Sequence, residues 1–392
     1  MTLISTINRL ENRLSQAFSS STWLYKILLI SIIISTLSAF PRYDYIYEFQ
    51  NLRKGPHGAW GILCMRSANL MDSSILADGD SHTRKLTFRL VLPILLKLFH
   101  QNVWYVVVLQ TLLGTFMMYL IAKIIYQLTS NKLTTFYFTL ATTSIYFGIS
   151  AFWELGGFGD SFAYGMLIIA MYYRNPIIIF GAITIASWTD ERGFIAGGYV
   201  LFWWLCRNSI ETKMGIKDIL NNIFSKQTFA IIASWIGYIL LRVWLTKYYN
   251  LDVDTHQIGG FMLGPEHSSS IGLGLWTSLE GFWIFILLTG IIMIGNWNEM
   301  RIVFWGYSCL IIFLCLTSCM VSDINRSISY GYPLILLGMV FLTKYLTKKE
   351  LHYFTALIAV ICLIHPLLMT FGSNLVVWAY PLPYQMIIFF FR

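Results

Sequence analysis

Long apolar runs, separated by short polar connections, constrain this chain more than any other feature. They begin at residues 22–40 and recur along all 392 residues, so that 57% of the chain is apolar and only 12% is charged. Soluble proteins carry about 25% charged residues. The longest polar gaps, 41–86, 207–227 and 248–275, are too short for an independent core. The sequence therefore predicts one all-α integral membrane domain over residues 1–392.

We expect about 11 transmembrane helices, with about 10 to 12 as the range. Residues 1–21 carry apolar side chains at helical spacing among polar ones, which predicts a cytoplasmic amphipathic helix on the membrane surface. Residues 86–100 are apolar but too short to span, so we expect interfacial or re-entrant helices in the first outer loop. The tail from Gly372 is interpreted as interfacial or partly re-entrant. The expected spans are 22–40, 102–125, 133–152, 161–173, 176–188, 194–206, 228–247, 276–295, 302–321, 328–343 and 351–371.

The basic residues predict the orientation. Lys and Arg concentrate in alternate short connections, which the positive-inside rule assigns to the cytoplasm together with the N-terminus. This topology places 14 of the 19 acidic residues on the outer half and five on the inner half. The net charge of +8 fits anionic lipid, so we expect no nucleic-acid partner. We expect a bacterial inner (cytoplasmic) membrane protein whose active site faces the periplasm or exterior.

The first outer loop contains the densest group of polar residues, Asp78-Gly-Asp80 followed by Ser-His82-Thr-Arg84, with Arg89 shortly after. Two carboxylates around a glycine suit a divalent cation, a sugar hydroxyl or a general base. The alternative is an Asp-Gly turn that caps a helix. The neighbouring basic residues favour a substrate that has both hydroxyls and a phosphate.

Two further connections place acids where they are costly. Glu154 and Asp160 flank a glycine-rich connection, and the expected span after it has only 13 residues, about 20 Å against a hydrocarbon core of about 30 Å. Acids at membrane depth are usually functional. Simple helix capping is the alternative for Asp160.

Asp190, Glu191 and Arg192 lie together between two more short spans. A local ion pair with Arg192 is the plain explanation there. Asp323 and Arg326 repeat the pattern at another connection, and Arg192 and Arg326 have the bidentate geometry that binds phosphate. Glu280, within an expected span, is a weaker candidate on the same grounds.

These motifs together resemble the GT-C superfamily of polytopic membrane glycosyltransferases. The resemblance covers residues 22–206, with the outer loop at 41–100. It rests on the acid-bearing first outer loop leading into Phe88-Arg89 and Pro93, on Gly159-Asp160 with the short helix after it, and on Thr189-Asp190-Glu191-Arg192. Residues 207–392, with an outer loop at 248–275, correspond to the variable C-terminal helices of such proteins.

The resemblance implies a polyprenyl-phosphate-linked or polyprenyl-diphosphate-linked sugar donor and a glycan or lipid-linked acceptor at the outer face. It makes Asp80 or Asp78 the general base. The expected substrate-binding residues are Glu154, Asp160, Asp190, Glu191 and His82. The expected phosphate-binding residues are Arg84, Arg89, Arg192 and Arg326.

No spacing of His, Cys or acidic residues predicts a specific metal ligand set. A divalent cation, Mg²⁺ or Mn²⁺, is the cofactor that the carboxylates would suit. Two alternative functions stay open beside the glycosyltransferase. One is a surface-polysaccharide polymerase or ligase of the O-antigen type, and the other is a flippase or transporter of lipid-linked sugars, against which the lack of an internal repeat counts.

Overall fold

The structure, a computed structural model, describes residues 3–40, 58–71, 86–207, 221–251, 265–321, 323–371, 374–377 and 379–391. Within these ranges 82% of residues are helical, in 19 helices. The described part also contains one antiparallel hairpin of two short strands, β1 (Leu368–Phe371) and β2 (Asn374–Val377). The expected helical class is therefore confirmed, with this hairpin as a departure from an all-α fold.

Three described helices are long and apolar enough to cross a membrane: α7 (Val103–Thr129), α14 (Lys226–Tyr248) and α17 (Trp297–Cys319). A fourth span results if α15 (Pro265–Leu279) and α16 (Gly281–Gly295), which meet at an angle of 82°, are counted together. These helices support a helical membrane protein. The figure of 11 spans stays a prediction.

Several expected spans are interrupted. Residues 133–152 form α8 (Lys132–Ser144) and α9 (Tyr146–Trp153), because Ile145 between them adopts an extended backbone conformation. Residues 276–295 bend at Glu280 rather than running straight. Residues 328–343 fall within α18 (Ile324–Ser329) and α19 (Tyr332–Tyr345). The expected span 351–371 also ends early: α20 (Lys348–Ile364) stops before His365, since Pro366 disfavours helical backbone in the preceding residue.

The short helices lie close to their expected positions. α10 (Asp160–Tyr172) packs between α7 and α11 (Pro176–Thr189), and α12 (Glu191–Arg207) follows α11 directly. The side chain of Asn175 accepts a hydrogen bond from the backbone N–H of Ile177, and Pro176 occupies the first turn of α11, where a missing N–H costs nothing. These three helices bring residues 160, 190 and 192 to one end of the molecule.

The N-terminal residues form α1 (Leu3–Ala17), which is amphipathic as expected, followed by α2 (Trp23–Ser38). The Nζ of Lys132 donates to the carbonyl of Phe18, and Glu11 lies 2.9 Å from the Nε2 of His352. These contacts hold α1 and its following turn beside the starts of α8 and α20. Its position on a membrane surface stays a prediction.

The first connection contributes α4 (Gly58–Ala68), the 3₁₀ turn η2 (Leu86–Phe88) and α6 (Val91–Leu98). The Trp60 indole donates to the carbonyl of Leu155 at 2.6 Å. Arg66 donates to the carbonyl oxygens of Thr87 and Arg89. α4 and the segment before α6 are thus fixed against each other and against the glycine-rich connection before α10.

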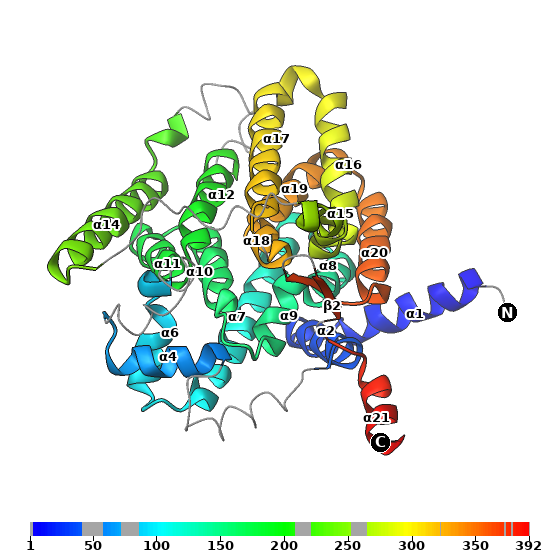
Figure 1. Ribbon diagram of the computed structural model, residues 1–392. Coiled ribbons are helices and arrows are strands. Elements are labelled where there is room, and N and C mark those ends of the chain that lie inside the picture. Colours follow the sequence, from blue (N-terminus) through cyan, green and yellow to red (C-terminus); the bar gives the residue numbers. More distant parts are fainter. Residues whose placement is uncertain are drawn as a thin grey trace.

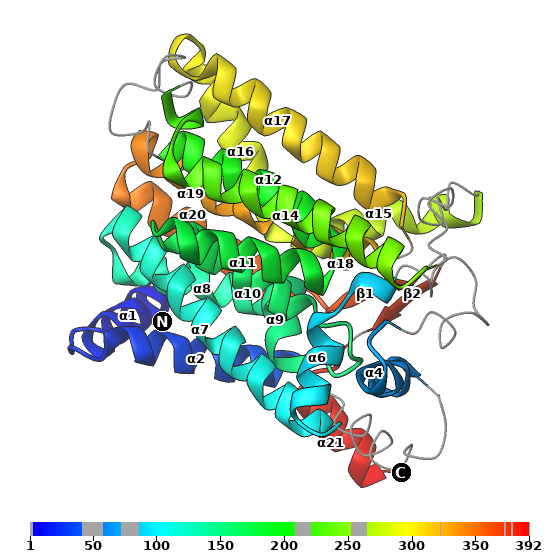
Figure 2. The ribbon, with the colours of Figure 1, turned by 90° about the vertical axis from the view of Figure 1, so that its left-hand side faces the viewer.

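The helices run between two chemically different ends, visible in Figure 2 as the two ends of the slanted stack of α17, α14, α12 and α11. At one end Lys344 pairs with Glu299 and Gln227 donates to the carbonyl of Arg174. We call this the basic end, defined by Lys132, Arg174, Lys226, Arg301, Lys344, Lys348 and Lys349. The opposite end contains the hairpin, α4 and α6 (Figures 1 and 2).

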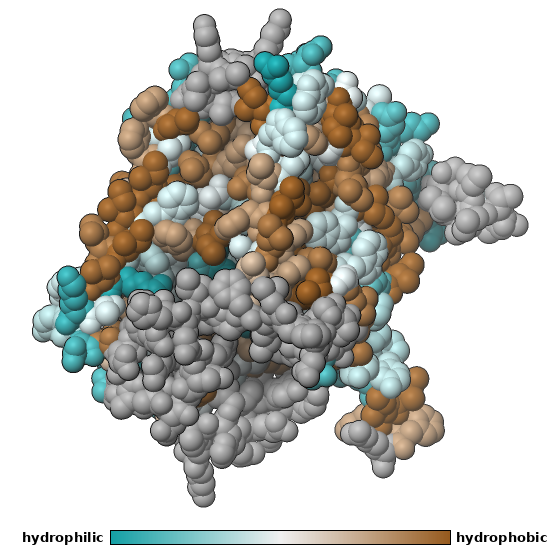
Figure 3. All heavy atoms as spheres, turned by 45° about the horizontal axis from the view of Figure 1, so that its top comes forward, coloured by the Kyte–Doolittle hydropathy of each residue, from teal (hydrophilic) through white to brown (hydrophobic). Residues whose placement is uncertain are grey.

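Apolar side chains cover much of the surface between these ends. Figure 3 shows brown residues over most of the coloured face and hydrophilic residues gathered mainly toward its margins. On α14 the exposed residues include Ile236, Leu240 and Trp244, and on α17 they include Ile312 and Leu316. α21 (Leu382–Phe391), which projects beside the C-terminus in Figure 1, has no buried residue. Such surfaces are typical of contact with lipid.

Candidate functional site

Seven charged side chains form one continuous array at the end opposite the basic end. We call it the charge network. It joins the residue after η2, the starts of α10 and α12, and the start of α18, which are distant in sequence. Its members are Arg89, Asp160, Asp190, Glu191, Arg192, Asp323 and Arg326.

Asp160 is one of two carboxylates of the charge network with no exposed surface. Arg326 binds it through two hydrogen bonds, Nε to Oδ2 at 2.5 Å and NH2 to Oδ1 at 3.2 Å. The hydroxyls of Tyr330 and Tyr146 donate to the two oxygens at 3.1 and 3.2 Å. A buried carboxylate with a bidentate arginine and two phenols is fully satisfied, so Asp160 is more than a helix cap.

Asp190 is the second buried carboxylate. Arg192 binds both of its oxygens at 2.8 Å, and Arg89 NH1 lies 2.9 Å from Oδ2. Burial alone would raise its pKa, but these two guanidinium groups outweigh burial and hold the pKa of Asp190 well below its usual range. The local pair with Arg192 exists as expected, and the contact with Arg89 extends it beyond the local chain.

Asp323 and Glu191 complete the array. Asp323 Oδ2 lies 2.5 Å from Arg326 NH1 and 3.5 Å from Arg192 NH1, so one carboxylate oxygen connects the two arginines. Glu191 accepts from Arg89 Nε at 3.0 Å and NH2 at 2.6 Å. Every arginine of the charge network is therefore already held by at least one carboxylate.

Two more arginines border the charge network. Arg66 is buried and donates to backbone carbonyls. Arg242, on α14, lies over the Phe88 ring at 4.4 Å and donates to the Tyr238 hydroxyl at 3.0 Å. Among the described residues neither makes an ion pair with a carboxylate. Arg242 is also partly exposed, so it is the cation of this region best placed to meet an external anion.

Glu154 lies near the charge network without joining it. Its Oε2 accepts from the backbone N–H groups of Phe158 and Gly159, both at 3.2 Å, and the folded connection places the Phe158 ring 4.1 Å from the guanidinium carbon of Arg326. Burial, with a smaller contribution from the Asp160 carboxylate, raises the pKa of Glu154 to about 7. Glu154 thus changes charge near neutral pH, whereas the lowered pKa of Asp190 keeps that acid ionised.

The structure brings most of the expected site residues together. Arg89, Asp160, Asp190, Glu191, Arg192 and Arg326 are all members of the charge network. The remaining catalytic, substrate-binding and phosphate-binding candidates of the first loop, Asp78, Asp80, His82 and Arg84, lie outside the described residues. The roles assigned to all of these residues stay predictions.

Sequence reasoning missed four members of this region: Tyr146, Tyr330, Arg66 and Arg242. Tyr330 follows Arg326 by four residues, the spacing that places side chains on one helix face. Arg242 is a cation inside an expected span, which is itself a functional signal. Tyr146 and Arg66 carry no comparable signal, because their partners are distant in sequence.

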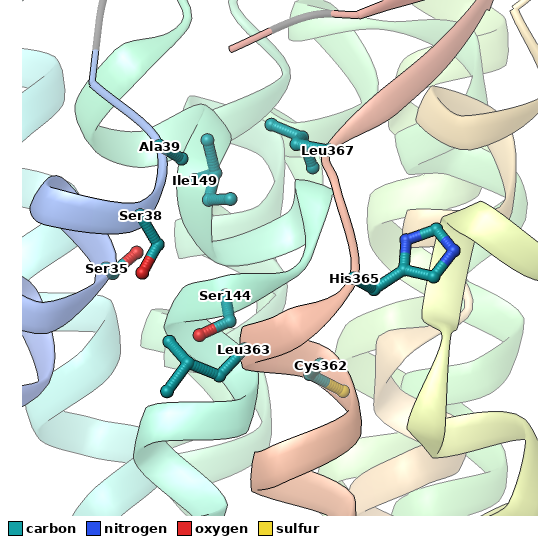
Figure 4. Close-up of a pocket in the computed structure, with 9 residues that line it drawn as sticks. All are labelled: Ser35, Ser38, Ala39, Ser144, Ile149, Cys362, Leu363, His365 and Leu367. Atoms are coloured by element: carbon teal, nitrogen blue, oxygen red, sulfur yellow. The ribbon is translucent and has the colours of Figure 1, made fainter. Parts of the chain in front are cut away.

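Within the described ranges, no three His, Cys, Asp or Glu side chains are grouped as metal ligands. A small pocket lies apart from the charge network, and Figure 4 shows the Ser35, Ser38 and Ser144 side chains around it. Each of these hydroxyls donates to a backbone carbonyl, of Thr143, Ile34 and Leu140 respectively. The three serines therefore offer only acceptor lone pairs to this pocket, which His365 and Cys362 also line.

Comparison of the chain with models of known protein families, with curated proteins and with solved structures found no match.

Proposed function

We propose that this protein is a membrane glycosyltransferase that moves a sugar from a polyprenyl-phosphate-linked or polyprenyl-diphosphate-linked donor to a cell-surface glycan or lipid-linked acceptor. The charge network carries the proposal: a dense, ordered array of acids and arginines at one end of strongly apolar helices. A lipid-linked sugar has matching chemistry, with an apolar tail, an anionic phosphate and polar hydroxyls. In this proposal the charge network faces the exterior and the basic end faces the cytoplasm.

Arg242 is the proposed first contact for the donor phosphate. Its helix, α14, exposes Ile239, Leu240 and Val243 around it, so a lipid tail on this surface would lead its phosphate toward the guanidinium group. Arg89 follows Phe88, whose ring stacks on Arg242, and retains N–H groups beyond those bound to Asp190 and Glu191. Arg192 and Arg326 hold carboxylates, so we assign them to ordering the site.

The chemistry needs a base for the acceptor hydroxyl and cationic stabilisation of the departing phosphate. Asp80, or Asp78, is the proposed base. Asp80 precedes Arg89 by nine residues in the sequence, which supports this assignment. The buried acids of the charge network, Asp160 and Asp190, accept hydrogen bonds at both oxygens, so their proposed part is to fix the arginines rather than to accept protons.

Binding of a phosphorylated lipid tests the proposal. The purified protein in detergent or nanodiscs is mixed with polyprenyl phosphate or with the uncharged polyprenol, and bound lipid is counted by native mass spectrometry. We expect retention of the phosphate form alone. Arg242→Gln should weaken it by about tenfold to a hundredfold, since one charge-assisted hydrogen bond contributes about 1.5–3 kcal/mol. Arg174→Gln, an exposed arginine at the basic end, is the matched control. Equal binding of the two lipids contradicts the proposal.

Transfer itself is tested with Asp80→Asn and Asp78→Asn in cells that display the glycan product. We expect one of the two to abolish the glycan at unchanged protein level, because amides cannot act as general bases. Full activity in both variants would show that neither aspartate is the base.

Transport of a lipid-linked sugar is the second candidate, and the bend at Glu280 favours it. Broken helices are a feature of many transporters. Movement of labelled lipid-linked sugar across proteoliposomes without any acceptor would favour transport over transfer.

A further inference from the structure

Glu280 lies at the break between α15 and α16, well separated in sequence from the residues of the charge network. Its backbone φ is 49°, in the left-handed region that a residue with a side chain rarely adopts. Its side chain has no exposed surface. An acid at a sharp bend, held in a disfavoured conformation and fully buried, marks a position with a specific task.

Both carboxyl oxygens of Glu280 lack a hydrogen-bond partner among the described residues. The nearest ionisable nitrogen is Nδ1 of His365, 3.3 Å from Oε1. Figure 4 shows the His365 ring turned away from the serine-lined pocket and toward the yellow-green ribbon of α15 and α16. An ionised carboxylate buried with no hydrogen bond is very costly, whereas a protonated one is much less so.

The contacts of His365 fix its tautomer. Nδ1 lies 2.8 Å from the carbonyl oxygen of Pro366, an acceptor, so Nδ1 carries a proton. Nε2 lies 3.2 Å from the indole nitrogen of Trp276, which only donates, so Nε2 carries a lone pair. These contacts match a neutral imidazole that is protonated at Nδ1. In that form His365 supplies no positive charge to offset an ionised Glu280.

We propose that Glu280 is a proton-binding site, and that His365 relays the proton between Glu280 and the surface. His365 is partly exposed, at 18% of its side chain, while Glu280 is fully enclosed. In loading, the hydrogen bond from Trp276 to Nε2 breaks and a proton from water bonds to Nε2. The Nδ1–H bond then breaks and its proton bonds to Glu280 Oε1. Unloading reverses these steps, and charge and atoms balance.

The groups around Glu280 and His365 favour a proton that is held by these two residues. The other titratable group beside it in the described structure is the Cys362 thiol of α20, which lies close to Gly281. On α18 the amide of Asn325 donates to Thr277 at 2.9 Å, one turn before Glu280, while Arg326 points to Asp160. The bend is thus joined to the helix that carries Arg326, so proton occupancy can alter the charge network through α18.

Infrared spectroscopy of the full-length protein in nanodiscs tests the proposal. The stretch of a protonated carboxylic acid lies clear of the amide bands. Glu154 also holds a proton near neutral pH, so both chains carry Glu154→Gln as background. We expect an acid band at pH 7 that is lost with Glu280→Gln. Superimposable spectra in the acid region would overturn the proposal.

The relay has its own readout. In the same background, His365→Phe should keep the acid band but slow its shift after transfer to D₂O by about tenfold or more. An unchanged exchange rate would remove His365 from the proposal. If Glu280→Gln does not fold, the proposal is tested on the unsubstituted protein by chemical labelling. A hydrophobic carbodiimide reacts with protonated carboxyl groups, so we expect its adduct on Glu280 by peptide mass mapping, and an unmodified Glu280 would overturn the proposal.

Discussion

The Asp160 carboxylate is the residue on which the charge network most depends, because it contacts Arg326 and two tyrosines without access to solvent. Arg326 is 7% exposed and would be left with less compensation if Asp160 lost its charge. Removing one partner of a buried pair typically costs about 3–5 kcal/mol.

We therefore expect Asp160→Asn to lower the thermal midpoint of the detergent-solubilised protein by several degrees. Glu299→Gln is the control, since Glu299 is 62% exposed in its pair with Lys344 and such pairs contribute less than about 1 kcal/mol. Equal midpoints for the two variants would show that the buried pair stabilises the protein no more than the exposed pair does.

Glu154 predicts a pH dependence of stability opposite in sign to that of Asp190. Its pKa rises from 4.5 to about 7 on folding, so the folded state holds a proton that the unfolded state loses. This contribution to stability is complete below about pH 4.5 and disappears as the pH rises through 7. Glu154→Gln removes it, and the full effect is about 3 kcal/mol.

Thermal midpoints are measured from pH 4.5 to 8. The midpoint of Glu154→Gln should rise relative to that of the unsubstituted protein up to about pH 7. Above that pH the difference between the two midpoints should stay constant. Asp190, whose pKa is lowered, gives the reverse trend at more acidic pH in both proteins. A constant difference across the range would mean that Glu154 is ionised throughout.

The sequence located the acids and arginines of the charge network but not their partners. Asp160 and Arg326 are 166 residues apart, and no local pattern specifies such a contact. The sequence did predict the ion pair of Asp190 and Arg192, because these two residues are close together in the chain. The long-range contacts depend on how α10, α12 and α18 pack, which only the folded structure defines.

At the scale of elements, close helix packing decides where spans break. α9 approaches α7 at Gly114, where an added Cβ would collide with the Cβ of Ala151 and lie 3.2 Å from its Cα. The break at Ile145 that allows α9 this approach has no signal in the sequence, since an isoleucine in an apolar run resembles its neighbours. Pro366, by contrast, predicts the end of α20.

We expect Gly114→Ala to destabilise the protein by about 1–3 kcal/mol through overpacking. Gly290 in α16 is the matched site, because a methyl group added there would have no neighbouring atom within 4 Å, so Gly290→Ala should be neutral or stabilising by up to about 1 kcal/mol. The two thermal midpoints, compared in one detergent, measure the difference. Similar shifts at both sites would contradict the close approach of α7 and α9.

For the whole molecule, the separation of the charge network from the basic end is the main organising feature. The positive-inside pattern predicted this separation, because it depends on composition of the connections rather than on packing. Among the described residues, three helices are long and apolar enough to span a membrane alone, and short, broken and bent helices alternate with them. The figure of 11 spans therefore stays a prediction.

The proposed orientation is tested by labelling single cysteines with a membrane-impermeant thiol reagent. Lys348→Cys, at the basic end, should react only after the cells are permeabilised. Asn374→Cys, at the exposed first residue of β2, should react in intact cells whose outer surface is accessible. Reaction of Lys348→Cys in intact cells would reverse the proposed orientation.

The central claim is that the charge network and Arg242 receive a lipid phosphate. An experimental structure of the protein with bound polyprenyl phosphate tests it most directly, through the position of the phosphate density. We predict contact with Arg242 and Arg89 and a tail along α14. Phosphate density at the basic end, beside Arg174 or Lys344, would contradict the account.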